Sequence, residues 1–143
     1  MIKEKYLGAY MKTARVFAEL SSSRRKQVGA VVVKDDRIIS IGYNGMPSGW
    51  DNNCENELYQ PVGRVNLVTK PEVLHAESNA IAKLAKSTES GDGASMFITC
   101  SPCIECAKMI FQSGIKEVFY DEDYRDAGGI VFLNKCGITV KQI

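Results

Sequence analysis

Strand and helix patterns alternate along the second half of the chain, and this alternation constrains the fold more than any other feature. Short β-branched or apolar runs are each followed by a stretch with helical periodicity. The predicted elements are a helix over 76–86, a strand over 96–99, a helix over 103–112, a strand over 115–120, a helix over 127–135 and a strand within 137–143. Strands joined by helices form right-handed crossovers and pair in parallel. The last strands of the sheet are therefore predicted to be parallel.

The first half of the chain supplies a different pattern. Residues 3–20 carry apolar residues at helical spacing, among them Leu7 and Met11, which predicts an amphipathic helix. Two β-branched runs, 28–34 and 37–43, are separated by a pair of aspartates, which predicts a β-hairpin. Together the two halves predict an α/β fold, a three-layer α/β/α sandwich around a mixed five-stranded sheet.

Length and composition indicate one domain, residues 1–143, with an internal insertion at about 44–73. The formal net charge is +1, which argues against a nucleic-acid partner, although Arg24, Arg25 and Lys26 form a short basic run. No apolar run approaches the ~20 residues of a membrane span, and charges interrupt the N-terminus, so neither a membrane span nor a secretory signal is expected. Five cysteines without such a signal indicate a reducing, cytoplasmic location, which is the host cytoplasm if the chain is viral.

Two short motifs, each at the start of a predicted helix, suggest a metal site. The first is His75-Ala76-Glu77, which contains the one histidine of the chain, and the second is the PCIEC stretch with Cys103 and Cys106. Helix N-termini favour thiolates, and two cysteines one turn apart can face the same ion. One histidine and two cysteines leave a fourth position open, which is typical of a catalytic zinc. We therefore expect His75, Cys103 and Cys106 to hold zinc.

Glu77 is predicted to be the catalytic residue. It lies two residues beyond His75, where it can reach a water activated by zinc and move its proton to a leaving group. H-x-E combined with P-C-x-x-C is the signature of zinc-dependent nucleobase deaminases. A structural zinc bound by four cysteines, or a redox pair of thiols, is the less favoured interpretation, because no second C-x-x-C exists.

Several longer stretches extend the match to a known family. QVGAVVV (27–33), GYNGMP (42–47), HAESNAI (75–81) and SPCIECAKMIFQSGIKEVFY (101–120) resemble the deoxycytidylate (dCMP) deaminases of the cytidine deaminase-like fold. The resemblance implies conversion of dCMP to dUMP. We include conversion of dCTP to dUTP as a further expectation. It also implies a homohexamer that is activated by dCTP and inhibited by dTTP, with Mg²⁺ on the effector. By the same resemblance, Gly42, Asn44 and Gly45 contact the effector, although the segment can also be read as a plain turn.

Substrate recognition is expected to involve basic and aromatic side chains. Arginine binds phosphate bidentately, so a 5′-phosphate is expected to contact Arg24, Arg25, Lys26 or Arg125. The remaining candidates are Asn44 at the sugar, Ala76, and Tyr120 and Tyr124, which either flank the pocket or pack at a strand end.

The chain departs from the family in two places. Ser23 and Arg24 stand where the family often has Asp-Pro, and the only histidine is His75, so we expect one zinc ion per subunit. Cys100 is assigned to the end of a strand near the pocket and left out of the metal set. The alternative functions are a tRNA-type adenosine deaminase and a non-catalytic nucleotide-binding module on the same fold.

Overall fold

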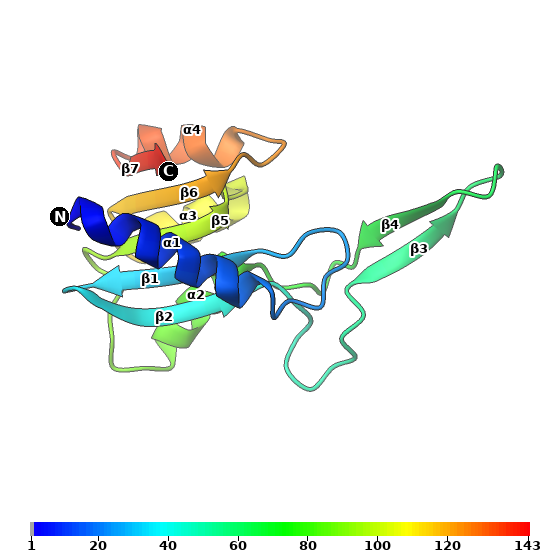
Figure 1. Ribbon diagram of the computed structural model, residues 1–143, viewed down its shortest axis with the longest axis horizontal. Coiled ribbons are helices and arrows are strands. Elements are labelled where there is room, and N and C mark those ends of the chain that lie inside the picture. The colour runs from blue at the N-terminus through cyan, green and yellow to red at the C-terminus, as the bar shows by residue number, and fades with distance from the viewer. Residues whose placement is uncertain (1) are drawn as a thin grey trace.

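The computed structural model describes residues 2–143 and contains a mixed five-stranded sheet with helices on both faces (Figure 1). The elements are α1 (Glu4–Ala18), β1 (Gly29–Lys34), β2 (Arg37–Tyr43), β3 (Glu55–Tyr59), β4 (Val65–Thr69), α2 (Ala76–Ala85), β5 (Ser95–Cys100), α3 (Ile104–Gln112), β6 (Glu117–Glu122), α4 (Gly128–Lys135) and β7 (Thr139–Gln142). The strand order is β2-β1-β5-β6-β7; β1 pairs antiparallel with β2 and β5, and β5, β6 and β7 are parallel. The predicted fold class is confirmed, and the bounds of the predicted elements shift by no more than two residues.

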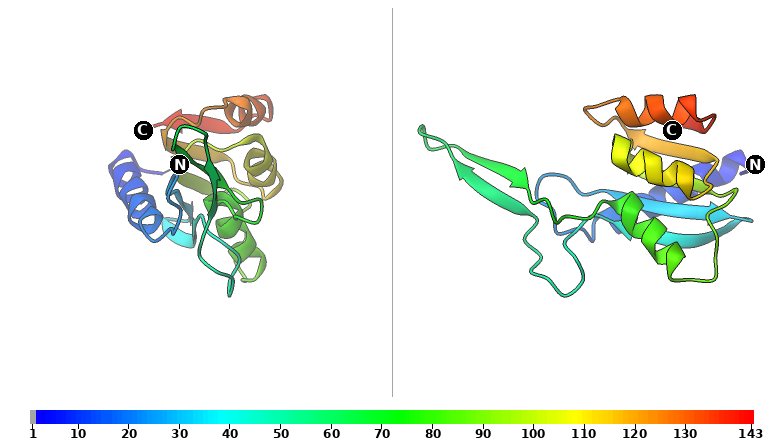
Figure 2. Two further views of the ribbon diagram at one scale, coloured as in Figure 1. Left: turned by 90° about the vertical axis from the view of Figure 1, so that its right-hand side faces the viewer. Right: turned by 180° about the vertical axis from the view of Figure 1, so that it is seen from behind.

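The three layers follow from strands that are apolar on both faces. Helix α1 covers one face of the sheet, and α2, α3 and α4 cover the other (Figure 2). Along β1, Ala30 and Val32 pack on the α2 and α3 side, whereas Val31 and Val33 pack on the α1 side. Successive strand residues point to opposite faces, so a continuous apolar run is what a central strand covered on both sides requires.

The predicted hairpin between β1 and β2 has a tight turn without glycine. Asp35 and Asp36 have φ values of 52° and 57°, in the left-handed region. Two consecutive residues with positive φ are typical of the type I′ turn, and aspartate tolerates this conformation better than most residues.

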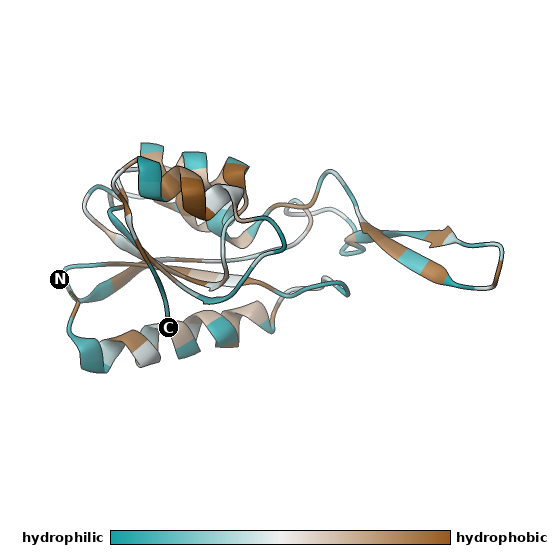
Figure 3. Cartoon of the chain, turned by 90° about the horizontal axis from the view of Figure 1, so that it is seen from above, coloured by the Kyte–Doolittle hydropathy of each residue, from teal (hydrophilic) through white to brown (hydrophobic). Residues whose placement is uncertain are grey.

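The insertion at 44–73 contains a second, two-stranded sheet that the sequence did not predict. Strands β3 and β4 pair antiparallel and extend away from the main domain as an arm (Figures 1 and 3). The backbones of Gly45 and Leu74 exchange hydrogen bonds of 3.0 and 2.8 Å at the foot of the insertion. The chain therefore returns to the main domain one residue before His75.

Two close backbone approaches fix the helices that carry the predicted metal ligands. A Cβ atom on Gly42 of β2 would lie 2.2 Å from the carbonyl oxygen of Ala76, and one on Gly129 of α4 would lie 2.0 Å from that of Pro102. Only glycine leaves space for these approaches. The start of α2 and the segment before α3 are thus packed directly on neighbouring backbone.

No helix in the part of the chain that the structure describes combines the length and the apolar character needed to cross a membrane.

Candidate metal centre and active site

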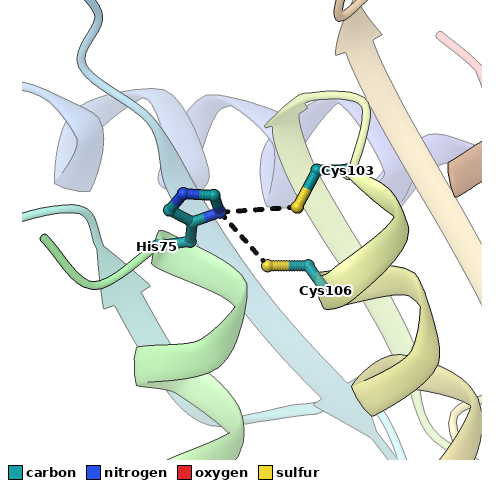
Figure 4. A group of neighbouring side chains, drawn as sticks. All are labelled: His75, Cys103 and Cys106. Carbon is teal, nitrogen blue, oxygen red and sulfur yellow. Dashed lines mark hydrogen bonds between the residues drawn. The ribbon is translucent and has the colours of Figure 1, made fainter. Parts of the chain in front are cut away.

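The predicted metal ligands lie at the N-termini of two neighbouring helices. His75 is the N-cap residue of α2, Cys103 is the N-cap residue of α3, and Cys106 lies in the first turn of α3. Both N-cap residues have extended backbone, with ψ values of 156° and 167°, and neither side chain caps its own helix. The imidazole and both thiols are therefore free to point toward one another, as Figure 4 shows.

The distances between the three ligand atoms fit a zinc ion. His75 Nδ1 lies 3.6 Å from Cys103 Sγ and 3.3 Å from Cys106 Sγ, and all three atoms lie within 4.8 Å of one another. Zn–N bonds of about 2.1 Å and Zn–S bonds of about 2.3 Å in a tetrahedron place N and S about 3.6 Å apart. The donor set and its spacing thus suit zinc without rearrangement.

The electrostatic environment favours a thiolate at Cys103, whereas the contact with Cys103 and burial raise the pKa of the Cys106 thiol. Hydrogen bonds from Cys106 and His75 lower the pKa of the Cys103 thiol to about 3. The same contact with Cys103 raises the pKa of His75. Cys106 is buried at 2% exposure, whereas Cys103 is half-buried and His75 is exposed. The group is closed on the Cys106 side and open on the other, which suits a catalytic rather than a structural zinc.

Glu77, the predicted proton carrier, is buried beside this group. Its side chain lies in the first turn of α2, is 4% exposed, and lines the same cavity as His75 and Cys103. Burial raises the pKa of the Glu77 carboxyl group to about 7. A carboxyl group held in such a place is suited to accept and return a proton at neutral pH.

A cavity of about 520 Å³ opens over the metal group. This volume lies within the range of small-molecule sites, which is about 300–1,000 Å³. The predicted substrate-contacting residues that line it are Arg25, Lys26, Asn44, Ala76, Tyr124 and Arg125. Six predicted substrate-contacting residues thus line the cavity, although they come from four separate segments of the chain.

Three cationic side chains lie at this cavity. Arg25 and Lys26 belong to the loop before β1, and Arg125 follows β6, where its guanidinium lies 5.7 Å from the centre of the Tyr124 ring. Arg25 Nη1 donates a hydrogen bond of 3.2 Å to Thr69 Oγ1, and Lys26 Nζ pairs with Glu122 at 2.6 Å. They place positive charge at the cavity that the net charge of the chain does not reveal, although Lys26 pairs with Glu122 and Asp123 also lines the cavity.

Asn44 connects the cavity to the loop that carries two of these cations. Its Oδ1 accepts a hydrogen bond of 2.9 Å from the Val28 N–H, and its Nδ2 donates one of 2.8 Å to the Lys26 carbonyl. The adjacent Gly42 is buried against α2, and Gly45 pairs with Leu74. The segment expected to contact an effector therefore also joins β2, α2 and the basic loop.

Two of the predicted substrate-contacting residues lie outside the residues that line the cavity. Tyr120 lies within β6, opposite Ile98 and Gln142, and is half-buried there. The guanidinium of Arg24 contacts Glu57 and Asn53 of the insertion. Their proposed contacts with substrate stay predictions.

Some cavity residues were missed by sequence reasoning. They are Ser23, Val28, Thr69, Val73, Ser101 and Asp123; Cys100, which was expected at a strand end near the pocket, also lines the cavity at the end of β5. Ser101 Oγ accepts a hydrogen bond of 2.6 Å from the Tyr124 N–H, which ties the loop of Arg125 to the end of β5. The position of Ser101 directly before the PCIEC motif was the one local signal for this role.

The fold and the metal group together place this chain among the zinc-dependent deaminases. The sequence family described as the cytidine and deoxycytidylate deaminase zinc-binding region matches residues 4–122. Human deoxycytidylate deaminase is 37% identical over 93% of this chain and 76% of its own length, and the enzyme of phage T4 is 37% identical over 80% and 77%.

A solved structure extends the likeness to the whole chain. The dCMP deaminase of cyanophage S-TIM5, in complex with dCMP and dUMP, is 45% identical, with a TM-score of 0.90 and complete coverage of both chains. The chain therefore belongs to the cytidine and deoxycytidylate deaminase family, on the dCMP deaminase branch.

Proposed function

We propose that this protein catalyses the hydrolytic deamination of dCMP to dUMP. One observation carries the proposal: the His75, Cys103 and Cys106 group and the buried Glu77 share a cavity with three cationic side chains. When the pyrimidine base of dCMP lies over the metal group, the 5′-phosphate of the nucleotide reaches the cations. The relatives whose names specify dCMP support the same substrate.

The residues of the chain divide the chemistry between them. His75, Cys103 and Cys106 would hold the zinc ion, which when bound would supply a water whose pKa is lowered to about 7. The Glu77 carboxylate takes a proton from the attacking water and delivers it to N3 of the cytosine ring. Glu77 then takes the remaining proton of that water, from the hydroxyl group now bonded to C4, and passes it to the departing amine, so that dCMP and water give dUMP and ammonia. Burial of Glu77 keeps its proton from exchanging with bulk solvent during this transfer.

The phosphate is bound by Arg25 and Lys26 from one side and Arg125 from the other. Arginine forms paired hydrogen bonds with phosphate oxygens, and lysine contributes a point charge. The cavity is open to solvent at this side, because all three cations lie at exposed positions. We include dCTP as a further substrate on this ground, since its additional phosphates extend outward.

Comparison of four substrates tests the proposal. Ammonia release is measured with dCMP, dCTP, deoxycytidine and an RNA anticodon stem-loop. We expect the highest kcat/KM with dCMP, a lower value with deoxycytidine and no reaction with RNA. Deamination of the RNA alone would assign the cavity to a tRNA-type adenosine deaminase, and no reaction with any of the four would favour a binding module.

We also propose that dCTP activates the enzyme and dTTP inhibits it, with Mg²⁺ on the bound nucleotide. The segment of Gly42, Asn44 and Gly45 supports this, because it touches α2, the insertion and the basic loop. The test is the rate with dCMP in the presence of each nucleotide, with and without Mg²⁺. Rates that neither nucleotide changes would contradict the regulation and leave the catalytic proposal intact.

We propose a homohexamer in the cytoplasm. The arm exposes apolar side chains, namely Leu58, Tyr59, Val62, Val65 and Val68, and a two-stranded sheet alone is only marginally stable in water. The five free cysteines accord with a reducing compartment. Light scattering is expected to give six times the chain mass of 15.8 kDa, and a monomer would contradict the assembly.

A further inference from the structure

A buried carboxylate outside the zinc site accepts a concentrated set of hydrogen bonds. Glu55, the first residue of β3, is 1% exposed. It accepts hydrogen bonds from Ser23 Oγ at 3.1 Å, from the Arg24 N–H at 3.0 Å and from the Arg25 N–H at 3.2 Å. Nothing in the deamination chemistry uses this group, so its burial requires another explanation.

The donors to Glu55 are consecutive residues of one loop. Successive backbone N–H groups that converge on an anion form a nest, which fixes the backbone around the negative charge. Burial alone raises the pKa of Glu55, but the hydrogen bonds from Arg25, Arg24 and Ser23 outweigh it and hold the pKa below its ordinary value. Glu55 is thus a permanent anion at neutral pH, and the loop is shaped around it.

The same loop presents two of the cations of the cavity. Arg25 is held at two points, by its N–H on Glu55 and by its guanidinium on Thr69 Oγ1 at 3.2 Å. Glu55 and Thr69 are directly opposite each other in the β3–β4 pair. The N–H of the next residue, Lys26, lies 3.4 Å from Ser23 Oγ, which itself donates to Glu55. Glu55 and Thr69, at the foot of the arm, therefore hold Arg25 directly and the backbone of Lys26 through Ser23, while Glu122 holds the Lys26 ammonium group.

We propose that Glu55 and Thr69 are positioning residues that set Arg25 and Lys26 for the phosphate of the substrate. The foot of the insertion then determines the preference for a phosphorylated nucleotide over the free nucleoside, although it touches neither base nor metal. This inference rests on the proposed function, because it assumes a nucleotide whose phosphate lies at these cations.

Glu55→Gln tests the inference, with Glu57→Gln as its matched control. Glutamine keeps the shape of the side chain but turns an NH₂ group toward N–H donors, so the loop must move. Glu57 is two residues along the same strand, is exposed, and its carboxylate contacts the side chains of Arg24 and Tyr59. KM and kcat are measured with dCMP and with deoxycytidine for each variant.

The expected result is a separation between the two substrates. Loss of a charge-assisted contact corresponds to about tenfold or more, so KM for dCMP in Glu55→Gln rises by about tenfold while kcat stays within about twofold. Both constants for deoxycytidine stay unchanged, and Glu57→Gln resembles the wild type with either substrate. A merely structural role would lower kcat with both substrates, and that outcome overturns the inference.

Thr69→Val provides a second variant if Glu55→Gln does not fold, as judged by circular dichroism and zinc content. Valine keeps the shape of threonine and removes only the acceptor for Arg25, so KM for dCMP rises by about threefold. An unchanged KM for dCMP in Thr69→Val, or in a folded Glu55→Gln, overturns the inference.

Calorimetric binding of dUMP and deoxyuridine to the same zinc-loaded variants separates the two proposals. If the wild type binds dUMP more tightly than deoxyuridine but deaminates no substrate, the proposed deaminase function is contradicted and the positioning role is not. Loss of that preference in Glu55→Gln still supports the positioning role. Equal binding of both ligands by the wild type overturns it.

Discussion

At the scale of single residues, position relative to a helix N-terminus separates the two sulfurs of the candidate zinc site from Cys100. Cys103 and Cys106 begin α3, whereas Cys100 ends β5 and lines the same cavity without joining the metal group. Sulfur type and burial alone would not distinguish them, since Cys100 and Cys106 are both buried. The start of α3 is what brings Cys103 and Cys106 close to His75.

Substitution of these cysteines is expected to give opposite results for zinc content. Cys106→Ser replaces a thiolate by a hydroxyl group that binds zinc poorly, so we expect zinc to fall from about one ion per chain to nearly none. Cys100→Ser is the control from the same cavity and is expected to retain its zinc. Elemental analysis of both purified variants provides the measurement, and loss of zinc from Cys100→Ser would show that the metal group is wrongly assigned.

Glu77→Gln separates metal binding from proton transfer. The amide fits the buried site but cannot carry a proton, so we expect full zinc content and a fall in kcat of about 10²-fold or more. Glu105→Gln is the control, because Glu105 lies in the first turn of α3 but is exposed and pairs with Lys108. Turnover by Glu77→Gln at the rate of the wild type would remove Glu77 from the mechanism.

At the scale of elements, the packing of β2 on α2 determines where His75 lies. Gly42→Ala would place a methyl group 2.2 Å from the Ala76 carbonyl oxygen, so α2 must move away from the sheet. We expect a loss of about 2–3 kcal/mol of unfolding free energy, which is typical of overpacking. Denaturant unfolding of the zinc-loaded protein measures this change.

The control for Gly42→Ala is Gly8→Ala. Gly8 lies inside α1, and nothing comes within 4 Å of an added Cβ atom there. Alanine favours the helix over glycine by about 1 kcal/mol, so this variant is expected to be more stable than the wild type. If Gly42→Ala and Gly8→Ala had the same free energy of unfolding, β2 and α2 would be able to move apart without a loss of stability.

The contact between the arm and the basic loop is expected to depend on pH. The pKa of Glu55 is lower in the folded protein than its ordinary value of 4.5, so its contribution is complete above that pH and is lost as the pH falls through the folded pKa. The stability difference between the wild type and Glu55→Gln should therefore be constant near neutral pH and shrink below about pH 4.5. Urea unfolding of both proteins over this range tests it, and a difference that grows on acidification would contradict the direction of the shift.

Periodicity explains which elements the sequence predicted and which it did not. The central strands β1 and β5 are buried on both faces, so their apolar runs are almost continuous. Strands β3 and β4 are almost entirely exposed, because the arm packs against nothing in the described chain beyond its foot. A strand without a buried face needs no regular alternation of apolar and polar residues, so its sequence does not predict a strand.

At the scale of the whole molecule, the metal group could be predicted but its supporting contacts could not. His75, Glu77, Cys103 and Cys106 stand next to helix starts, so local sequence indicates both their type and their place. Glu55 meets its donors only because a 44–73 insertion folds back on the loop before β1. Such contacts join distant segments, and one sequence holds no local signal for them.

The attraction of the protein for an anionic substrate should be local to the cavity rather than a property of its overall charge. Arg25→Gln and Arg37→Gln each lower the formal net charge from +1 to zero, but Arg25 lines the cavity, whereas Arg37 begins β2 and pairs with Glu89. At low salt we expect Arg25→Gln to reduce kcat/KM for dCMP by about tenfold and Arg37→Gln to leave it unchanged. Raising the salt from about 0.1 to 1 M shortens the screening length from about 10 to 3 Å, so it should weaken the reaction of the wild type and of Arg37→Gln more than that of Arg25→Gln. Equal losses in the two variants would instead assign the attraction to the charge of the whole molecule.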